Sequence, residues 1–177
     1  MNLTQLFTGI SYVVIGGVAT RLYMPERFTK DIDVLVGAQS YDAARERLQE
    51  ATWQAASELR FPDSSLGLRG YLWTLNDASL DLLTSDKQWA EEACSTPAVD
   101  QSANRIISLP YLVLMKLDSG RPQDTADVSR MVALAAVGTL DMVRDVLRRY
   151  ARDSETLEDF DSLLEIGRWE LGRPNNS

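Results

Sequence analysis

Apolar and polar residues follow two different periods along the chain, and the change falls near Pro110. Before it, short runs rich in Val, Ile, Leu and aromatic residues are separated by amphipathic segments, as in strands alternating with helices. The predicted strands cover 12–15, 31–36, 68–75, 80–83 and 104–108. The predicted helices of this half cover 1–9, 18–24, 41–51 and 86–93. This half therefore predicts an α/β (α+β) fold with a mixed β-sheet.

After Pro110 the apolar residues recur with the helical period, interrupted by Gly, Pro and an Asp-Ser pair. The predicted helices cover 110–119, 123–136, 139–151 and 155–170. A helical bundle therefore follows the sheet. We expect an α/β domain over 1–109, a helical C-terminal region over 110–172 that closes a cleft, and a mobile polar tail over 173–177.

The composition restricts the chemistry available to the chain. It has 177 residues, 45% of them hydrophobic, no His and one Cys, which is Cys94. Triads that use His, zinc sites and an intramolecular disulfide are excluded on this ground, and Cys94 has no His to activate it. The net charge of -8 opposes nonspecific binding to a nucleic-acid backbone. Without a leader or an apolar run of about 18 residues, we expect a cytoplasmic protein with no membrane partner.

Asp31 and Asp33 place two carboxylates in an otherwise apolar predicted strand. Successive side chains of a strand point to opposite faces, so these two project together while Ile32 and Val34 project to the other side. Two anions at this separation repel each other unless a cation lies between them. Because hard oxygen ligands without His favour magnesium, this strand predicts a Mg²⁺ site.

Two further features extend this pair into a constellation suited to metal and phosphate. Gly16 and Gly17 follow the first predicted strand and let the backbone of a tight turn approach a phosphate, and the next helix offers free N–H groups. Asp81 is a third acid within an apolar strand. In a two-ion arrangement, Asp31 and Asp33 bridge the metals and Asp81 lies on the side of the attacking hydroxyl.

These residues resemble the motifs of the nucleotidyltransferase superfamily that shares its fold with DNA polymerase beta. The matching residues are Gly16-Gly17, Asp31-Ile32-Asp33 and Leu80-Asp81-Leu82. The later segment from Leu114 to Val128 is similar to the Lys, Arg-Pro-x-Asp-x-x-Asp segment of small bacterial nucleotidyltransferase-like proteins. That group includes toxins of the AbiEii type. The resemblance covers roughly residues 10–135.

The resemblance implies roles for individual residues. It implies that the catalytic carboxylates, which are also the ligands of a two-ion Mg²⁺ site that accepts Mn²⁺, are Asp31, Asp33 and Asp81. It implies that the nucleotide-binding residues are Gly16, Gly17, Lys116, Arg121 and Asp124, with Lys116 reaching the triphosphate. Asp124 would orient Lys116 or the acceptor, and Asp127 would help to form the cleft wall. Arg21, Arg27 and Lys30 are further candidates for neutralising phosphate.

The implied reaction is magnesium-dependent transfer of a nucleoside monophosphate from a nucleoside triphosphate to an acceptor hydroxyl. The acceptor class stays open: an RNA 3′ end, as in the toxin group, a protein side chain, or a small molecule such as an antibiotic. A toxin-like transferase acting on RNA, with a cognate antitoxin or toxin as partner, ranks first by a small margin. A different interpretation is a non-catalytic, partner-binding protein that retains the fold without a working site.

Overall fold

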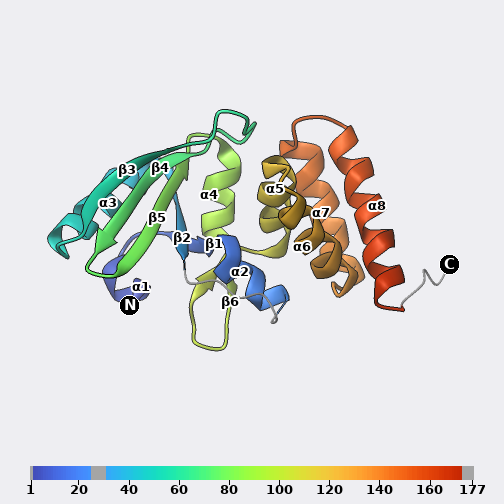
Figure 1. The fold of residues 1–177 in the computed structure, drawn as a ribbon, viewed down its shortest axis with the longest axis horizontal. Coiled ribbons are helices and arrows are strands. Elements are labelled where there is room, and N and C mark those ends of the chain that lie inside the picture. The colour runs from blue at the N-terminus through green and yellow to red at the C-terminus, as the bar shows by residue number, and fades with distance from the viewer. Residues whose placement is uncertain (1, 25–30, 173–177) are drawn as a thin grey trace.

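The computed structural model describes residues 2–24 and 31–172. A β-sheet with its own helices lies beside a bundle formed by the last part of the chain (Figure 1). The predicted tail 173–177 and the candidates Arg27 and Lys30 lie outside the described residues. None of the helices in the described part of the chain combines the length and the apolar character needed to cross a bilayer.

The sheet is mixed, as the sequence predicted. Its strands are β1 (Tyr12–Ile15), β2 (Ile32–Gly37), β3 (Gln54–Arg60), β4 (Arg69–Leu75), β5 (Ala78–Ser85), β6 (Ala98–Val99) and β7 (Arg105–Ile106). Among the described residues they form one seven-stranded sheet in the order β3-β4-β5-β2-β1-β7-β6. The pairs β2–β5 and β1–β7 are parallel, and the other neighbours are antiparallel.

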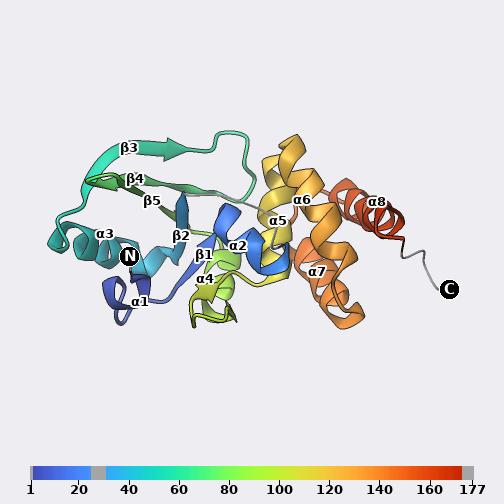
Figure 2. The same ribbon diagram turned by 60° about the horizontal axis from the view of Figure 1, so that its bottom comes forward.

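The helices of the sheet half are α1 (Leu3–Leu6), α2 (Gly16–Tyr23), the 3-10 helix η1 (Ala38–Ser40), α3 (Tyr41–Glu50) and α4 (Gln88–Ser95). In Figure 2, α3 and α4 lie on the same side of the sheet. Arg45 of α3 stacks on Tyr71, whose cross-strand partner is Leu82. Helix α3 therefore covers the sheet face that carries Leu82, and Asp81, one residue earlier, faces the opposite side.

The bundle consists of α5 (Leu109–Ser119), α6 (Pro122–Ala133), α7 (Val137–Tyr150) and α8 (Glu155–Glu170). Pro110 and Pro122 stand at the first turns of α5 and α6, where a missing N–H costs nothing. Buried apolar residues of the sheet half and of the bundle form one continuous cluster, from Leu3 to Leu164. The predicted boundary after residue 109 coincides with the start of α5, and the division into domains stays a prediction.

Several details differ from the sequence prediction, and one of them is the two-residue strand β6, which was not predicted. Strand β3 was not predicted, because it is an edge strand with mostly exposed residues and no apolar period. Helix α2 begins at Gly16 itself, so the Gly-Gly pair forms the first turn of the helix and not a turn before it. The first helix, predicted over 1–9, is shorter, since α1 spans only Leu3–Leu6 among the described residues.

Candidate active site

Asp33 and Asp81 lie directly opposite each other on the parallel strands β2 and β5. Their carboxyl groups are close enough to affect each other's ionisation. The pKa of Asp33 is raised to about 6, chiefly by burial and then by the charges of Asp81 and Asp31, against the opposing effect of Arg121. The pKa of Asp81 is also raised, by burial and by Asp31, while its hydrogen bond with Asp33 lowers it. Both carboxyl groups therefore lie in a site with excess negative charge.

Asp31 precedes β2 by one residue and acts electrostatically on both carboxyl groups of this pair. Among the described residues, no three His, Cys, Asp or Glu side chains are grouped so that they could hold a metal ion, and Asp31, Asp33 and Asp81 therefore do not form such a group in this structure. Mg²⁺ takes one or two carboxylates and completes its shell with water and substrate phosphate, so the Asp33–Asp81 pair remains a candidate ligand pair. Two neighbouring carboxylates repel each other when both are ionised, and a divalent cation between them relieves that repulsion.

Gly16 brings the backbone against Asp33. Its φ is +62°, and a Cβ placed on it would lie 1.9 Å from Asp33 Oδ2, so the position requires glycine both for conformation and for space. Gly17 is the second residue of α2, and Ile15, the N-cap residue, offers no side-chain acceptor to the first turn. The N–H groups at this end of α2 are therefore directed to a position beside the carboxylates, where an anion is favoured.

Helices α5 and α6 bring the remaining candidates together at their junction. The Lys116 ammonium lies 2.7 Å from Asp124 Oδ1 and 2.8 Å from Asp127 Oδ2, and the Lys116 side chain is only 7% exposed. Arg121 Nε donates to Asp124 Oδ2 at 2.7 Å, and Ser119 Oγ donates to the same oxygen. Lys116 is thus held by two buried carboxylates, whereas the resemblance places it on the triphosphate.

Arg121 connects this junction to the acids of the sheet. Its side chain is 76% exposed, and its positive charge lowers the pKa of Asp33. Of the other cationic candidates, Arg21 lies exposed in the last turn of α2. The structure therefore places Asp33 opposite Asp81 and Gly16 against Asp33, and it joins Lys116 and Arg121 through Asp124. Asp31 and Arg121 act on Asp33 through their charges.

One contact between the sheet half and the bundle was missed at the level of the sequence. The Asp118 carboxylate, at the end of α5, accepts hydrogen bonds from Ser64 Oγ, Ser65 N and Ser65 Oγ in the connection between β3 and β4. Arg152, after α7, donates to the carbonyl oxygen of Asp63 in the same connection. The loop thus bridges from the sheet to the bundle (Figure 1). Polar loop residues this far apart in sequence carry no periodic signal that predicts their pairing.

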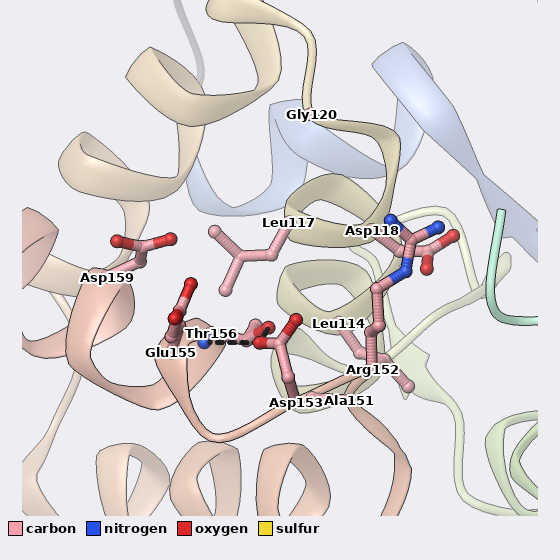
Figure 3. Close-up of a pocket in the computed structure, with 10 residues that line it drawn as sticks. All are labelled: Leu114, Leu117, Asp118, Gly120, Ala151, Arg152, Asp153, Glu155, Thr156 and Asp159. Atoms are coloured by element: carbon pink, nitrogen blue, oxygen red, sulfur yellow. Dashed lines mark hydrogen bonds between the residues drawn. The ribbon is translucent and has the colours of Figure 1, made fainter. Parts of the chain in front are cut away.

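A pocket of about 230 Å³ lies beside this bridge, between α5 and the start of α8 (Figure 3). Helix α5 supplies Leu114, Leu117 and Asp118, the segment after α7 supplies Arg152 and Asp153, and α8 supplies Asp159. In Figure 3 the dashed line marks the bond from Thr156 N to Asp153 Oδ1, which caps α8. Neither Asp33 nor Asp81 lines this pocket, so it is separate from the candidate active site.

A mixed sheet with acids on neighbouring strands, next to a helix that begins with glycine, defines the nucleotidyltransferase class. The chain belongs to the family described as "Nucleotidyltransferase of unknown function (DUF6036)", whose model matches residues 2–163. The protein is therefore a transferase of this superfamily, and the prediction from the sequence motifs is confirmed at that level. Assignment to the AbiEii-type subgroup stays a prediction. No curated protein matches the sequence.

The solved structures that match include two of ANT(2'')-Ia and one of a tRNA nucleotidyltransferase. The crystal structure of ANT(2'')-Ia in complex with adenylyl-2''-tobramycin has a TM-score of 0.50 at 14% identity and covers 87% of each chain. The solution structure of ANT(2'')-Ia, an antibiotic-resistance factor, has a TM-score of 0.47 at 15% identity and covers 97% of each chain. The tRNA nucleotidyltransferase, complexed with a primer tRNA and an ATP analog, has a TM-score of 0.36 at 11% identity; the match covers 97% of this chain and 61% of that one. At these identities the similarity concerns the fold alone.

Proposed function

We propose that this protein transfers a nucleoside monophosphate from a nucleoside triphosphate to the hydroxyl group of an acceptor. The observation that supports this most is the direct apposition of Asp33 and Asp81 on β2 and β5, with Asp31 close by and the N-terminus of α2 against them. Carboxylates beside free N–H groups suit a polyphosphate accompanied by a cation.

Asp31, Asp33 and Asp81 are the proposed ligands of Mg²⁺, in a two-ion site in which Mn²⁺ can substitute. Bound metal ions would offset phosphate charge, lower the pKa of the attacking hydroxyl and stabilise the in-line displacement. The three acids supply hard oxygen atoms only, as such ions require.

We assign separate roles in the transfer to individual residues. The N–H groups of Gly16 and Gly17 and the guanidinium group of Arg121 hold the polyphosphate, and Asp124 orients Arg121. Asp81, on the acceptor side, takes the proton of the attacking hydroxyl. A bond forms between the acceptor oxygen and the α-phosphorus, the bond from the α-phosphorus to the bridging oxygen breaks, and pyrophosphate leaves.

For the acceptor we propose a cationic small molecule that carries hydroxyl groups. The net charge of -8 attracts a cation and repels a nucleic-acid backbone. ANT(2'')-Ia, which has a similar fold, was crystallised with adenylyl-2''-tobramycin, so tobramycin is a reasonable first compound. The second candidate is a toxin that acts on RNA 3′ ends and is controlled by a cognate antitoxin, and the motif segment around Arg121-Pro122 favours it.

The test is a transfer assay with each α-labelled nucleoside triphosphate and Mg²⁺, offering tobramycin, total RNA and cell protein in parallel. We expect Asp33→Asn and Asp81→Asn to lower the transfer rate by more than about 100-fold while the protein stays folded. Asp77→Asn, an exposed position in the turn between β4 and β5, is the matched control and should transfer at the wild-type rate.

The location of the label identifies the acceptor class. Transfer to RNA and not to tobramycin would favour the toxin interpretation. If no acceptor is labelled, and Mg²⁺ with nucleotide does not raise the melting temperature, the proposed reaction is wrong. A non-catalytic, partner-binding protein would then be the better interpretation, because only a ligand that binds the folded state stabilises it.

A further inference from the structure

The junction between α5 and α6 contains a buried cluster of charges. Lys116 is 7% exposed at its side chain, Asp124 8% and Asp127 4%, and the ammonium group donates to both carboxylates. Gly120, with φ +62°, ends α5 and allows the chain to turn directly into α6. The cluster therefore ties the two helices together across a short turn.

Arg121 stands at the exposed edge of this cluster. Its Nε donates to Asp124 Oδ2, while its side chain is 76% exposed, and helices α5 and α6, which it joins, both pack against α2, whose first residue lies against Asp33. Asp124 is thus bonded on one oxygen to Lys116 and on the other to Arg121, with Ser119 Oγ also donating to the second oxygen. A carboxylate fixed in this way presents Oδ2 in one orientation, and that orientation determines where the guanidinium group points.

A direct contact between Lys116 and a bound triphosphate conflicts with this arrangement. Two of the three N–H donors of its ammonium group are directed to Asp124 and Asp127. Because the Lys116 side chain is only 7% exposed, its ammonium group would have to move out of this cluster to reach a phosphate, and Asp124 and Asp127 would both lose it as a partner. Breaking such a pair is strongly unfavourable, so the buried position of Lys116 is its stable one.

We infer that Lys116 is a positioning residue: through Asp124 it fixes Arg121, and Arg121 makes the contact with the polyphosphate. This inference rests on the proposed function. It assigns the effect of Lys116 on nucleotide binding to the orientation of Arg121, so the effect disappears when Arg121 is replaced.

The experiment compares the full-length wild type with three variants: Arg121→Gln, the double variant Lys116→Met/Asp127→Asn, and their combination. The double variant removes one positive and one negative charge, and Asp124, the buried carboxylate that remains, keeps Arg121 as its counter-charge. Binding of the α,β-methylene analogues of the nucleoside triphosphates with Mg²⁺ is measured by calorimetry, after thermal melting has shown that each variant is folded. Nitrogen-15 NMR of the arginine Nε–H groups reports the orientation of Arg121 without nucleotide.

We expect Arg121→Gln to weaken nucleotide binding by roughly 10- to 100-fold, as the loss of a charged hydrogen bond does. The Lys116→Met/Asp127→Asn variant should weaken it as well, and should add nothing once Arg121 is Gln. In this double variant, the Arg121 Nε–H signal, which is assigned by its absence in Arg121→Gln, should lose its protection from exchange. The Arg144 Nε–H signal, from the ion pair with Asp161 on α8, is the internal control and should not change.

If the losses of nucleotide affinity caused by Arg121→Gln and by Lys116→Met/Asp127→Asn multiply in the combined variant, Lys116 contacts the nucleotide itself and the inference is overturned. The inference is also overturned if the Arg121 Nε–H signal stays protected from exchange in the Lys116→Met/Asp127→Asn variant. If the signal depends on Lys116 but the wild type binds no nucleotide, the proposed function is wrong, and the inference about nucleotide binding is wrong with it.

Discussion

At Gly16 the backbone passes so close to Asp33 that no side chain fits between them. A Cβ there would lie 1.9 Å from Asp33 Oδ2, and φ is +62°. We predict that Gly16→Ala lowers the free energy of unfolding by more than about 1 kcal/mol, from the left-handed backbone alone, and displaces the Asp33 carboxyl group. Urea denaturation measures the first effect, and loss of metal-dependent nucleotide binding the second.

Gly138→Ala is the matched control. Gly138 lies in the first turn of α7, and a Cβ there would meet nothing within 4 Å. This substitution should raise the free energy of unfolding by about 0.5–1 kcal/mol, because alanine loses less backbone entropy in a helix than glycine. Equal effects at the two positions would contradict the close approach of Gly16 to Asp33.

Cys94 is a buried thiol whose chemistry is suppressed by its surroundings. Burial, and secondarily the charge of Glu91, raises the pKa of Cys94 to about 12, so the reactive thiolate is nearly absent at neutral pH. We predict that the native protein reacts with a disulfide reagent far more slowly than the urea-unfolded protein, as absorbance of the released thiolate would show.

The raised pKa of Cys94 also makes the stability of the protein decrease at alkaline pH. Since the folded pKa lies above the ordinary value of 9.0, the stabilisation from Cys94 is complete below pH 9.0 and decreases as the pH rises from there towards about 12. Cys94→Ala should make this alkaline decrease shallower. The buried position of Cys94 would be contradicted if Cys94→Ala left the alkaline decrease in stability unchanged. It would also be contradicted if the native protein reacted rapidly with the disulfide reagent.

At the scale of the elements, the connection between β3 and β4 is held on the bundle by Asp118. Ser64 and Ser65 donate three hydrogen bonds to its carboxylate. We predict that Asp118→Ala costs about 1–3 kcal/mol of stability and increases amide exchange in 61–68, because the donors lose their charged acceptor. Exchange mass spectrometry resolves this segment from the helices around it.

Asp141→Ala is the control for this prediction. Asp141 is on α7, its side chain is 70% exposed, and its ion pair with Arg144 is a surface pair at 3.5 Å. Such pairs contribute about 0–1 kcal/mol, so neither stability nor exchange in 61–68 should change appreciably. Unaltered exchange in the Asp118 variant would show that the loop is held by other contacts, such as that of Arg152.

At the scale of the whole molecule, Glu92 joins the sheet half to the bundle. From α4 it accepts hydrogen bonds from Tyr111 of α5 at 2.8 Å, and from Arg149 and Tyr150 of α7 at 2.8 and 2.7 Å. Burial opposes ionisation, but the bonds from Tyr150, Tyr111 and Arg149 outweigh it, so the pKa of Glu92 lies below its ordinary value of 4.5. One carboxylate thus links three helices.

This linkage predicts a defined acid sensitivity. With the folded pKa lowered, the stabilisation from Glu92 is complete above pH 4.5 and is lost as the pH falls below that value. Glu92→Gln should lower stability at neutral pH by about 1 kcal/mol and flatten the acid decrease, as denaturation at several pH values would measure. Glu50→Gln, at an exposed ion pair with Arg47, should change neither. Parallel acid curves for wild type and Glu92→Gln would refute the assignment.

The sequence by itself determined the strands and helices that carry a periodic signal. Asp33 and Asp81 were identified because each is an acid in an apolar strand, and the helices of the bundle because their apolar positions repeat with the helical period. Local conformation depends on nearby residues, so it can be predicted from short segments of the sequence. The edge strand β3, whose residues are mostly exposed, has no such signal and was missed.

Only the tertiary structure decided which of these residues meet. The register between β2 and β5 places Asp33 opposite Asp81, the path of α2 brings Gly16 against Asp33, and the junction of α5 and α6 buries Lys116 between two carboxylates. Each contact joins segments that are distant in sequence or depends on how two elements pack. Burial and pairing set the charge state of these groups, and both are properties of the folded chain that composition and spacing do not contain.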